Sequence, residues 1–283
     1  MKNAVKFMII SALGFSLMQL CVKYLQHLPT VEIVFFRSVV SIVLSVSMIL
    51  KLKISPWGNQ KKYLILRGLF GMTALTLFFY TLQNLPIATA ITIQYLSPIF
   101  TAIFAIFILG EKLKPVQFLF FLAAFVGVAV IKGFDDNVET KYLIAGVVSS
   151  IFAGLAYNMI RKVKDTDHPV VVVFYFPLIA IPVMFVLSLY QWTWPQGWDW
   201  GVLLLMGIFT QLAQVYMTKG WQAAEANTIA PLKYIGIIFA LFFDYTLFGI
   251  SPNLQTGLGI ALVLGGVILN VASSNRFKKK KTA

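Results

Sequence analysis

The segment "ANTIAPLKYIGIIFALFFDYTLFG", residues 226–249, carries a lysine and an aspartate inside a long apolar run. Lys233 lies seven residues into it, and a charge at such a depth in hydrocarbon is costly and usually functional. An ammonium group there could bind a carboxylate or phosphate through a charge-assisted hydrogen bond. The rival interpretation is structural, because Pro231 frees the carbonyl of Asn227, which Lys233 could reach.

Three further charges are predicted near the outer ends of apolar runs. They are Arg37 and Glu32 in the segment 30–50, and Asp244 in the segment 226–248. An ion pair of Arg37 with Asp244 or with Glu32 would lower the cost of burying these charges. The alternative is an outer gate, or a proton site at Asp244.

Neutral polar side chains could also line a cavity, although each one alone is more often a hydrogen bond between helices. Gln94 and Tyr95 stand out, because they are the counterparts of Lys233 and Tyr234 in the repeat described below. The other candidates are Gln19, Tyr157, Asn158, Gln211 and Gln214.

The sequence lacks the usual signatures of catalytic and metal centres. No Gly-rich loop precedes a Lys-Ser/Thr pair, so no ATP site is predicted. His27 and His168 fall in loops predicted at opposite faces, and Cys21 is the one cysteine. We therefore expect no enzymatic activity, no cofactor, no metal site and no intramolecular disulfide.

The composition indicates that lipid is the solvent for most of the chain. Of its 283 residues, 59% are hydrophobic and 12% are charged, whereas soluble domains average about 45–50% apolar and about 25% charged. The net charge of +13 would suggest nucleic acid for a soluble protein. Here the cations lie almost entirely in short segments between apolar runs, so no nucleic-acid partner is expected.

The predicted fold class is an all-α integral membrane protein with ten transmembrane helices. A spanning helix needs about 20 apolar residues, and the connections are too short to separate a soluble domain. The first span is predicted as a retained helix rather than a signal peptide, because its apolar run is long enough to span. The predicted spans are 4–24, 30–50, 63–83, 87–109, 115–132, 141–160, 169–190, 200–218, 226–248 and 254–273.

Basic residues divide unevenly between the two sides of these spans. With the N-terminus in the cytoplasm, most Lys and Arg fall in inner segments, and Lys23, Lys132 and Lys141 fall in outer ones. The positive-inside rule then predicts that both termini are cytoplasmic. Residues 276–283 form a basic tail on that side, and Arg67 is predicted near the inner interface.

The second half of the chain resembles the first when the two are aligned at one constant offset. Matching pairs include Gly68/Gly207, Ala74/Ala213, Gln83/Gln222, Thr89/Thr228, Tyr95/Tyr234 and Gly110/Gly249, and at nearly the same offset Ser11 meets Ser149. Each half, 1–134 and 135–275, would hold five spans, so the second half enters the membrane the opposite way up. Inverted repeats are the architecture of secondary transporters, whose substrate site lies near the midplane between the halves.

Three stretches resemble one family. They are "EIVFFRSVVS" (32–41), "LRGLFGMTALTLFFYTLQNLPIATAITIQYLSPIFTAIFAIFILGEKL" (66–113) and "AAEANTIAPLKYIGIIFALFFDYTLFGISP" (223–252). Together they look like the two EamA domains of the drug/metabolite transporter superfamily. The resemblance implies a ten-helix carrier of the inner membrane with a central cavity, in a family that mostly exports amino acids and related metabolites. The second repeat departs from the first in having "GISP" where the first has "GEKL".

We therefore expect a secondary-active transporter that exports a small polar metabolite, an amino acid or a related zwitterion or anion. Proton coupling or exchange would drive it. It would work as a monomer or a homodimer, and a small-residue stripe at Gly257, Ala261 and Gly265 would pack within the chain or between copies. The alternatives are a carrier for S-adenosylmethionine or a sugar- or nucleotide-type metabolite and, in another class, a membrane scaffold or sensor.

Overall fold

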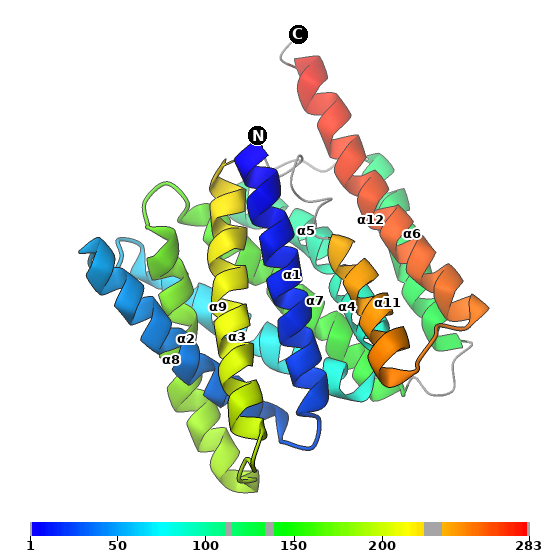
Figure 1. The fold of residues 1–283 in the computed structure, drawn as a ribbon. Helices are drawn as coiled ribbons and strands as arrows, with labels where there is room; N and C mark the ends of the chain where they lie inside the picture. Colours follow the sequence, from blue (N-terminus) through cyan, green and yellow to red (C-terminus); the bar gives the residue numbers. More distant parts are fainter. Residues whose placement is uncertain (1, 111–114, 134–138, 224–233, 282–283) are drawn as a thin grey trace.

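The computed structural model describes residues 2–110, 115–133, 139–223 and 234–281, and these residues form a bundle of helices (Figure 1). Within the described ranges, seven helices are long and apolar enough to cross a membrane, and three shorter apolar helices accompany them. The expected all-α membrane fold is therefore confirmed.

The first half contains α1 (Lys2–Tyr24), α2 (Thr30–Leu52), α3 (Lys61–Asn84), α4 (Ile87–Gln94), α5 (Ser97–Leu109) and α6 (Pro115–Gly133). The second half contains α7 (Thr140–Lys162), α8 (Pro169–Ser188), the short 3₁₀ helix η1 (Leu189–Gln191), α9 (Asp199–Ala223), α11 (Ile235–Phe248) and α12 (Leu254–Lys281).

The fourth predicted span, 87–109, is a broken helix rather than a continuous one. The chain leaves the α-helix at Tyr95 and Leu96, between α4 and α5. Pro98 has no N–H to donate to the carbonyl of Gln94, and its ring crowds the preceding turn. Discontinuous helices of this kind are common at the binding sites of secondary transporters.

The two halves enter the bundle in opposite directions. At the end of α1, Lys23 Nζ donates to the carbonyls of Gln83 and Leu85, at 3.1 and 3.0 Å. At the start of α7, the Tyr142 carbonyl accepts from Thr81 Oγ1 at 3.2 Å. The end of α1 and the start of its repeat counterpart α7 thus both lie beside the end of α3, while α1 begins and α12 ends at the opposite end (Figure 1).

Residues that match in the sequence repeat form two equivalent hydrogen bonds between the halves. Ser11 Oγ donates to the Ala213 carbonyl at 2.9 Å, and Ser149 Oγ donates to the Ala74 carbonyl at 2.7 Å. These four residues are two of the matching pairs in the sequence. Consequently α1 packs on α9 as α7 packs on α3, and α2 packs on its own counterpart α8.

The glycine pair Gly68/Gly207 explains how closely α3 approaches α8 and α9 approaches α2. A Cβ at Gly68 would collide with Ile179 of α8, and a Cβ at Gly207 would collide with Val40 of α2. Val40 and Ile179 are themselves counterparts in the repeat, at the same offset as the two glycines. Small residues permit such close helix approach in membranes. Gly68 therefore lets α8 of the second half pack on α3, and Gly207 lets α2 of the first half pack on α9.

α6 and α12 also pack through glycines. A Cβ at Gly259 would lie 2.8 Å from the Gly127 carbonyl oxygen, whereas a Cβ at Gly257 or Gly265 would meet no atom within 4 Å. Within the described part of the chain, Gly257 and Gly265 of the predicted small-residue stripe therefore make no close helix contact, since that contact uses the neighbouring face of α12. Packing of the stripe between copies stays a prediction.

We expect Gly259→Ala to lower the thermal unfolding temperature and Gly257→Ala to leave it unchanged or slightly higher. Both changes improve helix propensity by about 1 kcal/mol, but only the first forces a methyl group into α6, where overpacking costs about 1–3 kcal/mol. Unfolding of the purified variants in detergent, followed by tryptophan fluorescence, measures the difference. Equal shifts would contradict the close contact between α6 and α12.

Candidate functional site

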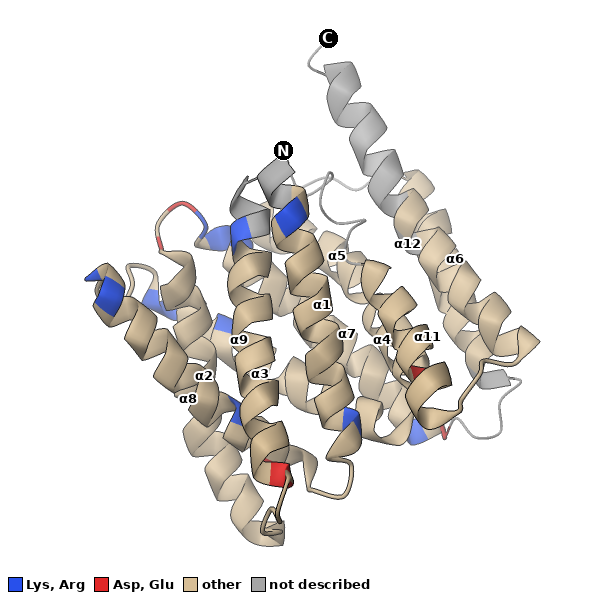
Figure 2. Ribbon diagram, viewed as in Figure 1, with Lys and Arg blue, Asp and Glu red and all other residues tan. Residues whose placement is uncertain are grey.

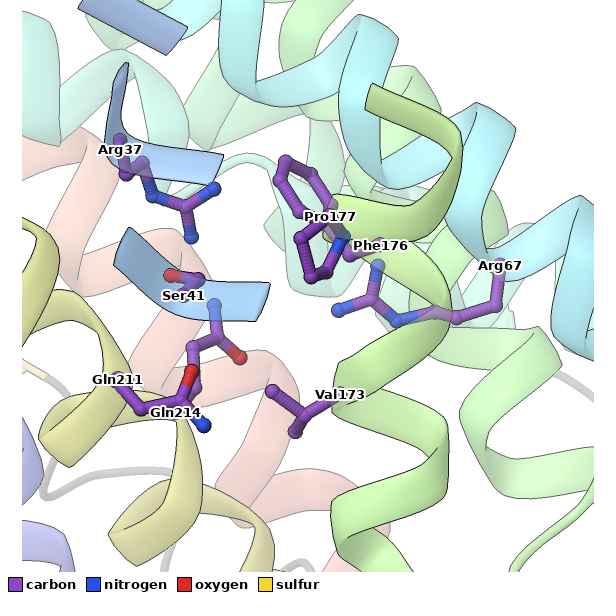
Figure 3. A pocket seen from close by; sticks show the side chains of 8 residues that line it. All are labelled: Arg37, Ser41, Arg67, Val173, Phe176, Pro177, Gln211 and Gln214. Atoms are coloured by element: carbon purple, nitrogen blue, oxygen red, sulfur yellow. The ribbon is translucent and has the colours of Figure 1, made fainter. Parts of the chain in front are cut away.

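A buried polar pocket lies where the two halves of the chain meet, and we call it the arginine pocket (Figure 3). The helices α2 and α3 of the first half and α8 and α9 of the second half form it. Ser41 and Gln211 stand near the middle of α2 and α9, so the pocket lies near mid-membrane. Its lining residues are Arg37, Ser41, Arg67, Val173, Phe176, Pro177, Gln211 and Gln214.

The pocket is dominated by two buried cations. Arg37 is 3% exposed and Arg67 is 6% exposed, and their guanidiniums point into the space between them (Figure 3). They lie close enough for the two positive charges to repel each other. Arg37 Nε and Nη1 and Arg67 Nε have no hydrogen-bond partner within the part of the chain that the structure describes.

One face of the Arg37 guanidinium is covered by an aromatic ring. The guanidinium carbon lies 4.5 Å from the ring centroid of Phe176, within the range of a cation–π interaction. Phe176 is the counterpart of Arg37 in the repeat. The pocket is therefore built on a symmetric pair of positions but is itself asymmetric, with a cation from one half and a ring from the other.

Neutral groups complete the lining. Gln211 Nε2 donates to Ser45 Oγ at 3.0 Å. Gln211 Oε1 and Ser41 Oγ are buried and have no hydrogen-bond partner in the described structure. The cavity holds about 10 Å³, which is room for about one water molecule. This conformation is therefore closed around the arginines, and a metabolite could enter only after the helices separate.

Arg67 corrects an expectation from the sequence. The sequence predicts it near the inner interface, but it is buried and its guanidinium reaches the pocket. Gly71, one helical turn later, makes this possible, because a Cβ there would collide with Arg67 Nη1. The signal in the sequence is "RGLFG", in which a glycine four residues after the arginine leaves room for the side chain to lie along the helix.

The predicted ion pair of Arg37 with Asp244 is wrong. Asp244 accepts hydrogen bonds from the backbone N–H groups of Ile87 and Ala88, at 2.9 and 2.8 Å. These are the first amides of α4, which have no partner within the helix, and a negative charge is favourable at a helix N-terminus. Lys23 is also near enough to attract the carboxylate. Asp244 therefore joins α11 of one half to α4 of the other.

The alternative pairing of Arg37 with Glu32 is wrong as well. Glu32 Oε2 accepts from the backbone N–H of Thr193 at 3.0 Å, so this carboxylate holds the chain between η1 and α9. Both acids are committed to backbone amides, which explains why neither neutralises the arginine. Whether Asp244 or Glu32 acts in gating stays a prediction.

A second cavity, of about 410 Å³, lies beside the contact of Asp244 with α4. It is lined by Pro86, Ala88, Thr89, Asp244, Ile250, Ser251, Pro252, Asn253, Thr256 and Ile260. It has the volume of a ligand pocket, but its charged lining residue, Asp244, already accepts two backbone hydrogen bonds. The arginine pocket is therefore the better candidate for recognising a charged substrate.

The tyrosines predicted for the site meet each other. The rings of Tyr95 and Tyr234 are edge to face, with centroids 5.0 Å apart and an interplanar angle of 88°. Because they are repeat counterparts, their contact marks the pseudo-two-fold axis of the bundle. Lys233, the neighbour of Tyr234, lies outside the described residues, so its role in anion binding stays a prediction.

Two of the other predicted site residues, Gln94 and Asn158, make hydrogen bonds between helices. Gln94 Oε1 accepts from Ser149 Oγ at 2.9 Å, and Asn158 Nδ2 donates to the Thr101 and Gly154 carbonyls, both at 2.9 Å. The Gln94–Ser149 and Asn158–Thr101 bonds join α4 and α5 to α7, and the Asn158–Gly154 bond lies within α7. Tyr157 lies near enough to Arg67 to interact with it electrostatically, and Gln19 is buried on α1 with an Oε1 that has no partner in the described structure.

We expect the effects of Arg37→Leu and Asp244→Ala on stability to add in the double variant. The two residues share no partner, and independent sites add within about 0.5 kcal/mol. Asp244→Ala alone should cost about 1.5–3 kcal/mol, because it leaves the amides of Ile87 and Ala88 without their charged acceptor. Unfolding of the four proteins of the cycle measures this, and rescue of one loss by the second change would restore the ion-pair hypothesis.

Known proteins resemble the chain over nearly its whole length. The pseudopaline exporter CntI of Pseudomonas aeruginosa is 29% identical, and the match covers 99% of this chain and 98% of the exporter. Human solute carrier family 35 member G1 is 31% identical over 95% of this chain and 76% of its own length. The S-adenosylmethionine uptake transporter of Rickettsia prowazekii is 24% identical, covering 99% and 96%.

A solved crystal structure shares the fold, with a TM-score of 0.68 at 17% identity over 98% of this chain and 99% of that chain. The family description "EamA-like transporter family" matches twice, at residues 2–133 and 140–272. These two matches cover the two sets of helices that the structure relates by inverted packing. The chain therefore belongs to the EamA-like transporter family.

Proposed function

We propose that this protein is a secondary-active transporter that moves a small polar metabolite across the cytoplasmic membrane by alternating access. The observation that carries the proposal is the arginine pocket, which is closed, polar and placed mid-helix between α2 and α3 of one half and α8 and α9 of the other. Binding sites of secondary transporters lie near the midplane at the repeat interface. The proposed substrate is an amino acid or a related zwitterion or anion, and the proposed direction is export.

The duplicated contacts support an alternating mechanism. The bonds Ser11–Ala213 and Ser149–Ala74 tie each half to the other in the same way, so exchanging the roles of the halves would give a second arrangement of similar energy. The halves differ at Asp244, whose counterpart in the first repeat is Ala105. The hydrogen bonds of Asp244 to the start of α4 would break when that end of the bundle opens. No equivalent bonds would form at the other end, because Ala105 has no carboxylate.

The distribution of charge supports an orientation. Lys and Arg gather at the end of the bundle where α1 begins (Figure 2). By the positive-inside rule this end would face the cytoplasm, with both termini there and the Asp244 contact at the outer face.

Single cysteines test this orientation in a Cys21→Ser background. Ser55 and Asn84 are exposed at opposite ends of the bundle, beyond α2 and at the end of α3. We expect a membrane-impermeant maleimide to label Asn84→Cys in intact cells, and Ser55→Cys only after the cells are permeabilised. The reverse pattern would place the termini outside.

Flux through proteoliposomes tests the function itself. Vesicles with the purified protein, preloaded with unlabelled pools of amino acids, sugars, nucleotides or S-adenosylmethionine, should accumulate a labelled member of one pool faster than protein-free vesicles. Gln211→Leu should slow this flux about 2–10-fold, the value of a typical neutral hydrogen bond. Gln255→Leu, an exposed change on α12, is the matched control.

The same experiment separates the alternatives. Flux of S-adenosylmethionine or of a sugar or nucleotide would replace the amino-acid substrate and leave the mechanism standing. A folded protein that moves none of the pools would favour a scaffold or sensor. Dependence of the flux on an imposed pH gradient, or on the unlabelled substrate inside, distinguishes proton coupling from exchange.

A further inference from the structure

The arginine pocket holds two positive charges with no acidic partner among the described residues. A guanidinium stays protonated in proteins, and these two are more than nine-tenths buried. Two buried acids, Asp244 and Glu32, bind backbone amides elsewhere. Asp244 accepts from the amides that begin α4, and Glu32 accepts from the N–H of Thr193. Within the described structure, the pocket is thus left with two uncompensated positive charges.

Such an arrangement is unfavourable by itself. A buried charge without a counter-ion is strongly destabilising, and here the two cations also repel each other. A structural role would require partners for the guanidinium nitrogens, yet three of these nitrogens have none in the described structure. The ring of Phe176 covers the face of Arg37 and leaves its edge, where hydrogen-bond donors lie, free to bind an anion.

We propose that the arginine pocket binds a doubly negative part of the transported metabolite, either two carboxylates or a phosphate, between Arg37 and Arg67. A dianion neutralises both guanidiniums, whereas a single carboxylate would leave one charge uncompensated. Guanidinium groups suit carboxylate and phosphate oxygens in particular, because their planar forks can bind them with two parallel hydrogen bonds. Gln211 Oε1 and Ser41 Oγ are placed to bind a neutral hydroxyl or amino group of the same molecule. This inference rests on the proposed transport function.

The proposal is tested with the full-length protein in detergent at constant ionic strength, with chloride as the reference anion. The probes are succinate and glycerol 3-phosphate, matched by succinamate and glycerol, which lack one or both charges. We expect one dianion to raise the unfolding temperature and its matched compound to have a smaller effect or none. Succinate and glycerol 3-phosphate separate the dicarboxylate from the phosphate source. If neither raises it above chloride, the proposal is overturned.

Substitutions locate the effect. Arg37→Gln and Arg67→Gln should each weaken binding of the active probe about 10–150-fold, the value of a charge-assisted hydrogen bond. Lys51→Gln, which removes an exposed cation from the same helix as Arg37, should leave the affinity unchanged. Equal affinity in all four proteins would place the anion elsewhere and overturn the proposal.

Stability without ligand gives a second readout. Removing one of two repelling, unpaired charges should raise the unfolding temperature of the ligand-free protein in Arg37→Gln or Arg67→Gln. A fall in both variants would show that the arginines are structural and would overturn the proposal. Arg37→Lys keeps the charge and loses the fork, so it should bind the probe less tightly than the native protein without this gain in stability.

Gly71→Ala tests the position of a charge rather than its presence. The new methyl group would collide with Arg67 Nη1 and push the guanidinium out of its place. We expect weaker binding of the active probe than in the native protein, and unchanged binding in Gly257→Ala, where the methyl group meets open space. Native affinity in Gly71→Ala would remove Arg67 from the site.

The proposed function and this inference can fail separately. Flux that persists unchanged in Arg37→Gln, together with no binding of either dianion, would end the inference and leave the transporter intact. Binding of a dianion that depends on Arg37 and Arg67, with no flux of any pool, would support the site and end the transport proposal.

Discussion

A charge inside a membrane needs compensation from the protein around it, because hydrocarbon supplies neither counter-ions nor hydrogen bonds. In this chain the described structure shows two buried charges, Lys23 and Asp244, that find that compensation in backbone groups. Lys23 donates to two carbonyls at the end of α3, and Asp244 accepts from two amides at the start of α4. The opposite charges of Lys23 and Asp244 also attract each other. These contacts hold α1, α3, α4 and α11 together at one end of the bundle.

Arg37 and Arg67 do not follow this pattern in the described structure. They face each other in a closed pocket near the middle of the bundle, with neutral amides, a hydroxyl and an aromatic ring as neighbours. In the proposal made above, the substrate supplies the negative charges that neutralise this arginine pair at the interface of the repeats. The ligand-free pocket is costly because its two positive charges repel each other. Binding of an anion would remove this repulsion as well as form new contacts.

The helix packing is symmetric between the two halves, whereas the charged side chains are not. Serine–carbonyl bonds, glycine contacts and the meeting of Tyr95 with Tyr234 all occur in related pairs. Arg37 faces its counterpart Phe176, and Asp244 has Ala105 as its counterpart. In the proposed mechanism, symmetric packing would give two arrangements of similar energy. Side chains without an equivalent in the other half, such as Arg37 and Asp244, would decide what is bound and which end is closed.

Much of the fold could be predicted from the sequence, because its signals are local or repeated. Apolar length predicts the spans, and matched pairs such as Gly68/Gly207 predict an inverted repeat that the packing then bears out. Pro98 predicts a bend, although the structure was needed to show that α4 and α5 are separate helices. The partners of the buried charged side chains could not be predicted from the sequence. Asp244 binds the amides of α4, and Arg67 reaches the pocket beside Gly71. Which groups compensate a buried charge depends on how neighbouring helices are rotated and how deeply each side chain reaches. Only the packing of distant segments determines those quantities.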